Sequence, residues 1–336
     1  MLNMVTVVCV SYNAEKYIEE AIDSVFKQTF KNFEVIVIDD GSKDSTLTIL
    51  QKYFKEPNFG LIKRNHVGNP GRLRNEAIKL SKYDLIAFID ADDVWIPLKL
   101  EKQLKYMEDY DLVCSNAERI VESNLVFDSL VSSTSKLLFG RKAAADFSRF
   151  TYTDLNQDTD IDLKKLLSMN YVITSSVLIT RDALIKANYF EDTLGYRGED
   201  FLLWLRVAKD HKIRFMCEPL VKYRIHSANL SMLTYKERCI NLERSVDIHT
   251  SYLKDRDQSI RKATREGLTF VYSELSKLTI DNKDYRSAAK YWFLYIRYRK
   301  GRFSKVYVKY VLIFLYLIVL SLLYGDSHKN KNLIFG

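Results

Sequence analysis

Compact apolar runs alternate with amphipathic segments over residues 5–90, and this alternation limits the possible folds more than any other feature of the chain. Each run has the length of a buried strand, lacks the polar alternation of a half-exposed strand, and ends in polar residues. Strands of this kind, separated by helices, form a parallel sheet covered on both faces, and ligands bind beyond the carboxyl ends of its strands. The predicted strands are residues 5–10, 33–38, 61–64 and 85–89, and the predicted helices begin near residues 18 and 72.

The rest of the chain predicts a less regular second half and a helical end. Residues 127–162 are rich in Ser, Thr and Asp and show no clear period, which indicates a long loop over the site. Further strands are predicted at residues 171–179, 213–217 and 220–225, with helices from Arg181 and Glu199, and only helix follows Thr234.

These patterns predict an α/β class of fold, with a mostly parallel sheet and helices on both faces. The expected catalytic domain is residues 1–232, with a nucleotide-binding half at 1–116 and an acceptor-binding half at 117–232. Residues 233–336 are expected to form a helical, membrane-associating region. No GxGxxG motif follows the first strand, so the dinucleotide-binding signature is absent from the sequence.

The net positive charge is confined to the end of the chain. The formal charge is +8, yet the first 280 residues carry 40 residues of each sign. A balanced main part lacks the basic face of a nucleic-acid-binding protein, so we expect no nucleic acid partner. The basic end surrounds the apolar segment 306–325. This combination predicts binding to anionic lipid of the inner leaflet, through an in-plane or spanning anchor, with a core helix as the alternative.

The start of the chain and the cysteines favour the cytoplasm. The first residues, MLNMVTVVCVSYN, have no basic n-region, and their apolar run is short for a signal peptide. The four cysteines form no CxxC pair, which predicts free thiols. We therefore expect the protein at the cytoplasmic face of the plasma membrane. The cysteines are Cys9, Cys114, Cys217 and Cys239.

Acidic residues follow two of the predicted strands. The sequence DDGS at residues 39–42 is a favourable turn, so capping alone can explain it. The sequence DADD at residues 90–93 places three carboxylates within four residues, and these repel one another unless a cation or several donors compensate. Oxygen ligands suit Mg²⁺ or Mn²⁺, which bind through one or two carboxylates and substrate phosphates. The second cluster therefore predicts a metal-diphosphate site.

Two further segments carry candidate catalytic groups. Glu199 and Asp200 open a helix, where acidic residues complement the helix dipole, although a carboxylate near a diphosphate site is also suited to general-base catalysis. His226 follows a strand in the sequence YRIHS. A lone histidine is usually structural, but its polar neighbours allow it to reach a ligand.

Five motifs, in this order and spacing, resemble the family 2 glycosyltransferases of GT-A fold, and the similarity covers residues 5–231. They are VTVVCVSYNAEKYIEEAIDSVFKQTFKNFEVIVIDDGSKDST, GRLRNEAI, FIDADDVWIPLKLEKQ, GEDFLLWLRV and YRIH. For the nucleotide, the resemblance implies that Val10 and Ser11 form a main-chain wall and that Asp40 holds the base, usually uracil. Arg74 matches an arginine near the nucleotide, with Arg72 as the alternative.

The resemblance also implies a metal site. Asp90, Asp92 and Asp93 match the element that binds the ribose and the metal-diphosphate. His226 matches a histidine near the diphosphate. The implied metal ligands are Asp92, Asp93 and His226, and the implied cofactor is Mn²⁺ or Mg²⁺.

Enzymes of this family transfer a sugar from a nucleotide-sugar donor, here expected to be a UDP-sugar, to an acceptor hydroxyl with inversion. Asp200 would be the catalytic base and Glu199 would contact the acceptor. Membrane attachment makes a lipid-diphosphate-linked saccharide the expected acceptor, in O-antigen or capsule synthesis.

Two alternatives remain at this stage. A metal-dependent nucleotidyltransferase would need a basic or Gly-rich triphosphate loop after the first strand, where the sequence has Ser11-Tyr12-Asn13. A non-catalytic sugar-nucleotide-binding protein would not need the carboxylate of Asp200.

Overall fold

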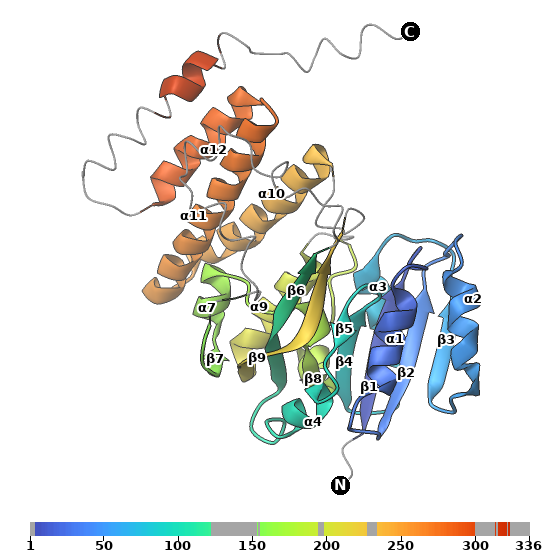
Figure 1. The fold of residues 1–336 in the computed structure, drawn as a ribbon. Coiled ribbons are helices and arrows are strands. Elements are labelled where there is room, and N and C mark those ends of the chain that lie inside the picture. Colours follow the sequence, from blue (N-terminus) through green and yellow to red (C-terminus); the bar gives the residue numbers. More distant parts are fainter. Residues whose placement is uncertain are drawn as a thin grey trace, which may run out of the picture. The chain divides into compact units, whose positions relative to one another are not determined.

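The computed structural model describes residues 4–121, 153, 155–193, 198–226, 234–299, 313, 315–320 and 322. The described residues up to His226 form one compact unit, and those from Thr234 onward form a second. Figure 1 shows the sheet of the first unit and the helices of the second. The domain boundaries at residues 116 and 232 stay predictions.

Four parallel strands form the first half of the sheet, in the order β3-β2-β1-β4. The apolar runs of the sequence are buried as predicted, and every residue of β2 is inaccessible or nearly so. The β–α alternation over residues 5–90 is therefore confirmed. The elements are β1 (Val5–Ser11), α1 (Ile18–Phe26), β2 (Phe33–Asp39), α2 (Thr46–Leu50), the 3₁₀ helix η1 (Gln51–Lys55), β3 (Phe59–Lys63), α3 (Pro70–Leu80) and β4 (Leu85–Asp90).

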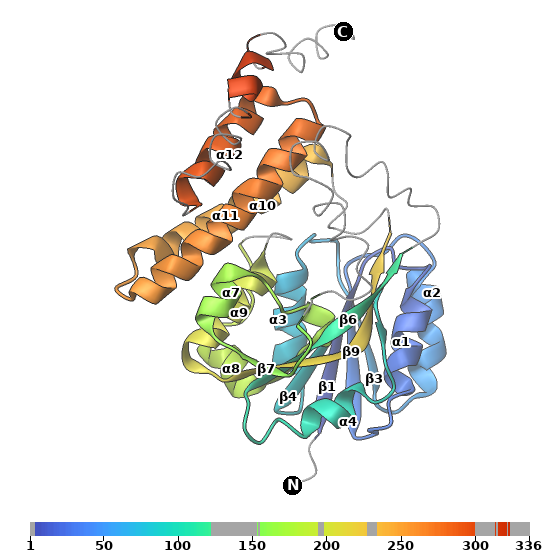
Figure 2. The same cartoon turned by 60° about the vertical axis from the view of Figure 1, so that its left-hand side comes forward.

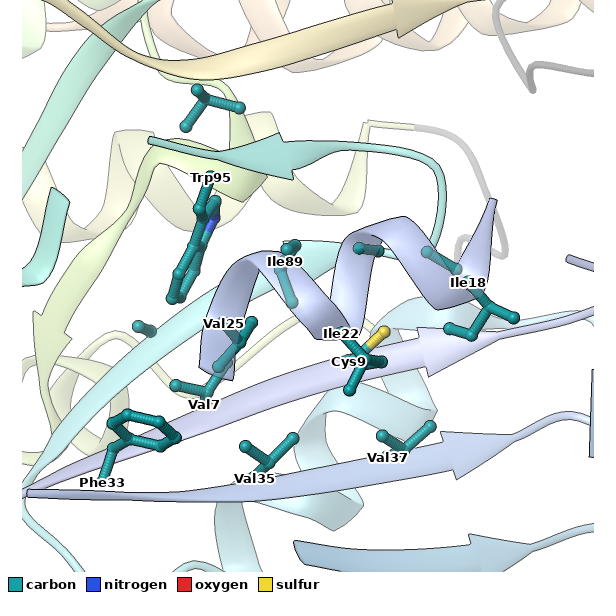
Figure 3. Packing of buried hydrophobic residues seen from close by; sticks show 14 of the residues in the cluster. Val7, Cys9, Ile18, Ile22, Val25, Phe33, Val35, Val37, Ile89 and Trp95 are labelled. Carbon is teal, nitrogen blue, oxygen red and sulfur yellow. The ribbon is translucent and has the colours of Figure 1, made fainter. Parts of the chain in front are cut away.

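Both faces of these strands are buried because side chains alternate along each strand. Ile18, Ile22 and Val25 of α1 pack on one face (Figure 3). Helix α3 lies on the other side of the strands (Figure 1), where its buried residues include Leu73 and Ile78. Strand residues toward α1 are Val7, Cys9, Val35 and Val37, and buried residues of opposite parity are Val8, Ile36 and Ile38.

The second half of the sheet is mixed, whereas β1, β2, β3 and β4 are parallel, so the prediction of a mostly parallel sheet holds only in part. Strand β8 is antiparallel to β4 and β6, β6 is parallel to β9, and β5 and β7 are antiparallel to β9. An apolar run fits a buried strand of either direction, so hydrophobicity alone did not encode this arrangement. The elements are β5 (Val94–Trp95), α4 (Lys99–Leu104), β6 (Leu112–Val121), β7 (Thr159–Ile161), α7 (Leu163–Ser168), the 3₁₀ helix η3 (Thr174–Ser176), β8 (Leu178–Thr180), α8 (Arg181–Lys186), α9 (Glu199–Asp210) and β9 (Ile213–Ile225). Figure 2 shows α7, α8 and α9 grouped together.

Two segment predictions in this half were wrong, and a third, the loop at 127–162, is tested only in its described residues. The predicted strand at 171–179 is a 3₁₀ turn, η3, followed by the short strand β8. The predicted loop at 127–162 includes β7, while its residues 127–152 and 154 lie outside the described residues. The two strands predicted at 213–217 and 220–225 are one strand, β9. Its pairing with β6 shifts where Asn116 meets Pro219, and proline, which lacks an amide hydrogen, tolerates such an irregular position.

Lys99, the first residue of α4, is fully buried. Its Nζ donates to Gln103 Oε1 at 2.7 Å and lies 4.0 Å from the centroid of the Trp95 ring. No carboxylate pairs with it within the described chain. Burial removes the ammonium from water and lowers the pKa of Lys99 well below its usual range.

A Lys99→Met variant is expected to raise the free energy of unfolding by about 1–3 kcal/mol at neutral pH, because Met carries no amine into the core. Because its pKa is lowered, the folded protein binds the Lys99 proton less readily than the unfolded chain does, so wild-type stability rises with pH up to about 10.4. The gain should therefore shrink as pH rises. Urea denaturation at several pH values measures it, and Lys102→Met, at an exposed ion pair with Glu218, should change little. An equal effect of both substitutions would contradict this account.

The second unit is helical in all its described parts, in agreement with the sequence after Thr234. Thr234 and Glu237 form a reciprocal capping box at the start of α10. Leu275 of α11 and Trp292 of α12 are fully buried in a shared hydrophobic cluster. The elements are α10 (Tyr235–Ser251), the 3₁₀ helix η5 (Tyr252–Lys254), α11 (Gln258–Asp281) and α12 (Tyr285–Tyr298).

The predicted apolar segment 306–325 is described only at residues 313, 315–320 and 322. Ile313 and Leu317 are buried in the cluster formed with α11 and α12. Leu315, Tyr316 and Leu322 are exposed. In the part of the chain that the structure describes, no helix has both the length and the hydropathy needed to cross a membrane.

Candidate active site

The carboxyl ends of β1, β2 and β4 lie at one edge of the sheet and carry most of the predicted nucleotide-binding residues. Val10 pairs with Ile38 on one side and Asp90 on the other. Ser11 pairs with Asp39 and accepts the main-chain N–H of Asp40 at 2.8 Å. The parallel register thus brings both acidic clusters to the end of β1.

The two carboxylates of the first cluster have different surroundings. Asp39 accepts hydrogen bonds from Ser11 Oγ and from the main chain and hydroxyl of Ser42, so it organises the turn. Asp40 is also buried, and its Oδ1 and Oδ2 accept the main-chain N–H groups of Val67 and Gly68 at 2.8 and 2.9 Å. Asp40 therefore holds the segment after β3 against the end of β2.

Gly41 makes this close approach possible. Its φ is +77°, a left-handed conformation that residues with a side chain rarely adopt. A Cβ atom at Gly41 would lie 2.8 Å from the main-chain nitrogen of His66 and 3.1 Å from Arg64 O. Neither main-chain group can retreat without moving the segment that Asp40 holds.

An aromatic pair that the sequence reasoning missed lies beside Asp40. The rings of Tyr12 and His66 are stacked, with centroids 4.1 Å apart and planes at 19°. His66 Nδ1 is 3.0 Å from Asp40 Oδ2. Tyr12 is 43% exposed. The sequence does show an aromatic residue directly after the first predicted strand, which could have indicated a stacking site, but it does not show that Tyr12 contacts His66.

Arg74 connects the strand edge to the start of α9. Its side chain is buried, with NH2 donating to Asp90 Oδ1 at 2.8 Å and NH1 donating to Glu199 Oε1 at 3.2 Å. Arg72, the alternative considered from the sequence, is exposed on α3. Arg74 is therefore the arginine that the structure brings into contact with the acidic groups.

Glu199 is buried in this network rather than exposed on the surface. Burial and the nearby Asp200 charge raise the pKa of Glu199 to about 7, while Arg74 opposes the rise. Gly71 of α3 lies so close that a Cβ there would be 3.0 Å from Glu199 Cγ. The structure thus places Glu199 as a partner of Arg74, and its predicted contact with an acceptor stays a prediction.

Asp200 follows Glu199 in the first turn of α9 and is partly exposed. Gly198, with a φ of 78°, precedes the pair in a left-handed conformation that turns the chain into the helix. Thr174 Oγ1 donates to Asp200 Oδ2 at 3.2 Å. Burial raises the pKa of Asp90, Arg74 opposes the rise, and Asp92 and Asp200 add to it. Both carboxylates are therefore close enough to Asp90 to influence it electrostatically.

In the second acidic cluster, Asp92 and His226 meet while Asp93 turns inward. His226 Nε2 lies 3.1 Å from Asp92 Oδ2. Asp93 is buried, its Oδ2 accepts from Ser175 Oγ at 2.5 Å and its Oδ1 from the main-chain N–H of Arg224 at 3.0 Å. Its predicted role as a metal ligand stays a prediction, because both of its oxygens already accept hydrogen bonds.

Ser175, which the sequence reasoning did not single out, supports this cluster from η3. Its Oγ accepts the main-chain N–H of Asp90 at 3.0 Å, in addition to donating to Asp93. The Nε1 of Trp95 donates to the main-chain oxygen of Ser175 at 2.8 Å. Trp95, which is buried, thus also positions the cluster.

The side chains of Asp92 and His226 fit a divalent cation site in which the protein supplies only some of the ligands. Among the described residues, no three His, Cys, Asp or Glu side chains are grouped to hold a metal ion. Asp92 and His226 provide one carboxylate and one imidazole at the same point. Mg²⁺ and Mn²⁺ sites of this kind are commonly completed by substrate phosphates and water.

An α/β sheet with carboxylates, an arginine and a histidine at its strand ends has the position and the groups of an enzyme active site, and comparison with known proteins identifies the class of enzyme. The chain belongs to glycosyl transferase family 2, whose model matches residues 6–154. It is therefore a glycosyltransferase, which sets aside the nucleotidyltransferase alternative and the protein without turnover.

Two curated relatives illustrate the similarity. The uncharacterized glycosyltransferase RP339 of Rickettsia prowazekii is 31% identical over 268 residues, covering 80% of this chain and 75% of the relative. The Escherichia coli UDP-Glc:alpha-D-GlcNAc-diphosphoundecaprenol beta-1,3-glucosyltransferase WfaP is 27% identical over 252 residues, covering 74% of this chain and 88% of WfaP.

Solved structures show the same fold. The crystal structure of S. aureus TarS 1–349 in complex with UDP matches with a TM-score of 0.60 at 19% identity, covering 88% of this chain and 82% of TarS 1–349. The mannosyltransferase PcManGT from Pyrobaculum calidifontis, in complex with GDP-Man and Mn²⁺, matches with a TM-score of 0.55 at 15% identity, covering 95% of this chain and 86% of that chain. The GT-A-like fold expected from the sequence is thereby confirmed.

Proposed function

We propose that this glycosyltransferase moves a sugar from a UDP-sugar to a hydroxyl of a lipid-diphosphate-linked saccharide, with inversion at the anomeric carbon. The observation that carries the proposal is the chain of contacts from Asp90 through Arg74 to Glu199, which joins the strand ends to the helix that bears Asp200. A nucleotide-sugar held at the strand ends would thus lie near a partly exposed carboxylate. The nucleotide, the cation and the Asp200 carboxylate, as catalytic base, would then lie at one site.

The nucleotide would lie along the end of β1. Asp40 retains acceptor capacity beyond its two main-chain hydrogen bonds, because a carboxylate offers about four acceptor positions. It can therefore also accept an N–H from uracil. The main chain of Val10 and Ser11 would border the ribose, and Tyr12 would offer its ring to the base. WfaP is named for a UDP-Glc donor and TarS was solved with UDP, which supports uracil as the base.

The proposed reaction is a single displacement. Asp200 accepts the proton of the acceptor hydroxyl as that oxygen attacks the anomeric carbon from the face opposite the departing UDP. Asp200 Oδ2 accepts from Thr174 Oγ1 at 3.2 Å and Oδ1 accepts the main-chain N–H of Phe201 at 2.6 Å. A carboxylate offers about four acceptor positions, so it can still take that proton. Arg74 holds the Asp90 carboxyl group by a hydrogen bond to Oδ1, at the strand end where the ribose would lie. Asp92 and His226 would hold the Mn²⁺ or Mg²⁺, which supplies compensation for the charge that develops on the diphosphate.

The proposed acceptor is attached to the membrane. WfaP and a second relative, WfgD, are both named for GlcNAc-diphosphoundecaprenol, and another relative, WbnJ, for O-antigen biosynthesis. Exposed apolar side chains at residues 315, 316, 319 and 322 and six basic residues within 297–309 support contact with an anionic lipid surface at the cytoplasmic face of the plasma membrane.

A donor and acceptor screen tests the proposal. The full chain is incubated with Mn²⁺, a set of UDP-sugars, GDP-mannose as the comparison donor, and synthetic GlcNAc-diphosphate-lipid. Released UDP gives the rate, and the proton coupling of the new anomeric centre gives its configuration by NMR. Retention of configuration, or transfer from GDP-mannose but from no UDP-sugar, would refute the proposal.

Replacing Tyr12 by Ala is expected to weaken UDP binding by about tenfold or more, since loss of a base–aromatic stack costs about 1–3 kcal/mol. Tyr12→Phe keeps the ring and should bind UDP nearly as the wild type does. Calorimetric titration with UDP measures both. Equal affinities of the Ala and Phe variants would show that the ring does not contact the base.

A further inference from the structure

The ring of Tyr17 contacts two side chains near the end of β9, those of His226 and Arg224. Its centroid is 4.5 Å from the centroid of the His226 imidazole, with the planes at 35°. On Arg224, the Cζ atom lies 5.1 Å from the same Tyr17 ring. Tyr17 is the residue before α1, so the contact joins the first helix of the chain to the end of the last strand.

Arg224 is held in place by several contacts of its own. Its Nε donates to the main-chain oxygen of Asp92 at 2.9 Å, and its main-chain N–H donates to Asp93 Oδ1 at 3.0 Å. Its guanidinium also pairs with Glu20 of α1. Arg224 thus connects the second acidic cluster to α1. The Tyr17 ring contacts the guanidinium that these interactions hold in place.

The imidazole of His226 can turn about two side-chain bonds, and its neighbours decide which way Nε2 points. Its side chain is 6% exposed, and Nε2 lies against Asp92 Oδ2 at 3.1 Å. The Tyr17 ring, with its centroid 4.5 Å from that of the imidazole and its plane tilted by 35°, leaves the imidazole less room to rotate. Hydrogen-bonding groups that orient a metal-binding histidine commonly change metal affinity about 10–100-fold when they are removed, and we expect a ring that limits the rotation of the histidine to act in the same direction.

We propose that Tyr17 is a positioning residue for the cation site, whose ring holds the imidazole of His226 so that Nε2 and the Asp92 carboxylate meet the same cation. This inference rests on the proposed function, because it assumes that a divalent cation binds between these two side chains. In this proposal Tyr17 acts through the His226 imidazole and not by direct contact with the cation. Its ring, rather than its hydroxyl, carries the effect.

Two substitutions separate the ring from the hydroxyl. Tyr17→Leu removes the flat ring and is expected to weaken Mn²⁺ binding in the presence of UDP by about tenfold, whereas Tyr17→Phe should stay within about twofold of the wild type. Bound Mn²⁺ is measured from the loss of the free-ion EPR signal, without any catalytic turnover. Binding of UDP with EDTA present, measured by calorimetry, should be unchanged in both variants and verifies that they fold.

One control variant and one supporting variant test the same contacts. Glu19→Gln removes a neighbouring charge that pairs with Lys52 instead of Arg224, and it should leave Mn²⁺ binding unchanged. Arg224→Lys keeps the main-chain donor to Asp93 but lacks a flat guanidinium for the Tyr17 ring, so it should weaken Mn²⁺ binding in the same direction as Tyr17→Leu.

The His226→Ala variant distinguishes a failure of this inference from a failure of the proposed function. If His226→Ala loses Mn²⁺ affinity while Tyr17→Leu binds Mn²⁺ as tightly as the wild type, the positioning role is refuted and the cation site stands. If neither variant changes Mn²⁺ binding, the cation site itself is refuted, and the positioning role falls with it.

Discussion

An Asp200→Asn variant is expected to lose about 10²–10⁴-fold in kcat while binding UDP and Mn²⁺ like the wild type. Asn has nearly the shape of Asp, and its amide oxygen can still accept one of the two hydrogen bonds that Asp200 receives, from Thr174 Oγ1 and from the main-chain N–H of Phe201. The amide cannot accept a proton from an attacking hydroxyl. The loss should therefore appear in the chemical step rather than in donor affinity.

UDP release at saturating donor and acceptor measures kcat, and calorimetry measures UDP affinity. Asp210→Asn is the matched control, because Asp210 is an exposed aspartate at the other end of the same helix. It should retain full activity. Unchanged turnover in Asp200→Asn would mean that another group accepts the proton, and the mechanism proposed above would be wrong.

Replacing Arg74 by Ala is expected to lower the free energy of unfolding by about 3–5 kcal/mol, the usual cost of leaving a buried charge without its partner. The substitution would leave Asp90 and Glu199 close to Asp200 with no cation between them. Arg74→Lys should be intermediate, because one ammonium cannot form the same pair of directed contacts as a guanidinium.

The stability lost on replacing Arg74 should depend on pH because Glu199 can bind a proton. Its pKa is about 7 in the folded protein, above the ordinary value, so the folded state already binds its proton more readily than the unfolded chain does. Without Arg74 the pKa rises further. Protonated Glu199 needs no partner charge, so the loss of stability should be smaller at mildly acidic pH than at mildly alkaline pH.

Urea denaturation of the variants at several pH values measures both effects. Arg72→Ala is the control, since Arg72 lies two positions away on α3 and is exposed. Exposed substitutions of this kind usually change stability by no more than about 0.5 kcal/mol. Equal destabilisation by the Arg72 and Arg74 substitutions would contradict the bridging role of Arg74.

Much of the first half of the fold could be predicted from the sequence, because its strands are buried on both faces and separated by amphipathic helices. The positions of Asp40 and Asp90 then followed, since parallel strands bring their carboxyl ends to one edge. The second half was harder. Burial does not reveal the direction of β8, and Pro219 interrupts the pattern of β9 without ending the strand.

The partners of the site residues could not be predicted in the same way. Arg74 and Glu199 are separated by 125 positions in the chain, and Tyr12 and His66 lie on different strand ends. Neither pair leaves a periodic pattern, because each contact depends on how the loops after the strands turn. The motif resemblance named several of these residues singly, whereas the contacts between them came only from three-dimensional structure.

The irregular pairing at Asn116 and Pro219 divides β9 into two stretches with different tolerance to change. Beyond it, the residues from Val221 to Ile225 keep an uninterrupted register with β6 up to the position of His226. Insertion or deletion of one residue in that stretch would shift the register by one position and turn the His226 imidazole to the opposite face of the sheet. Before it, an inserted residue can be absorbed at the existing irregularity. Natural length variation among related enzymes should therefore collect on the amino-terminal side of Pro219.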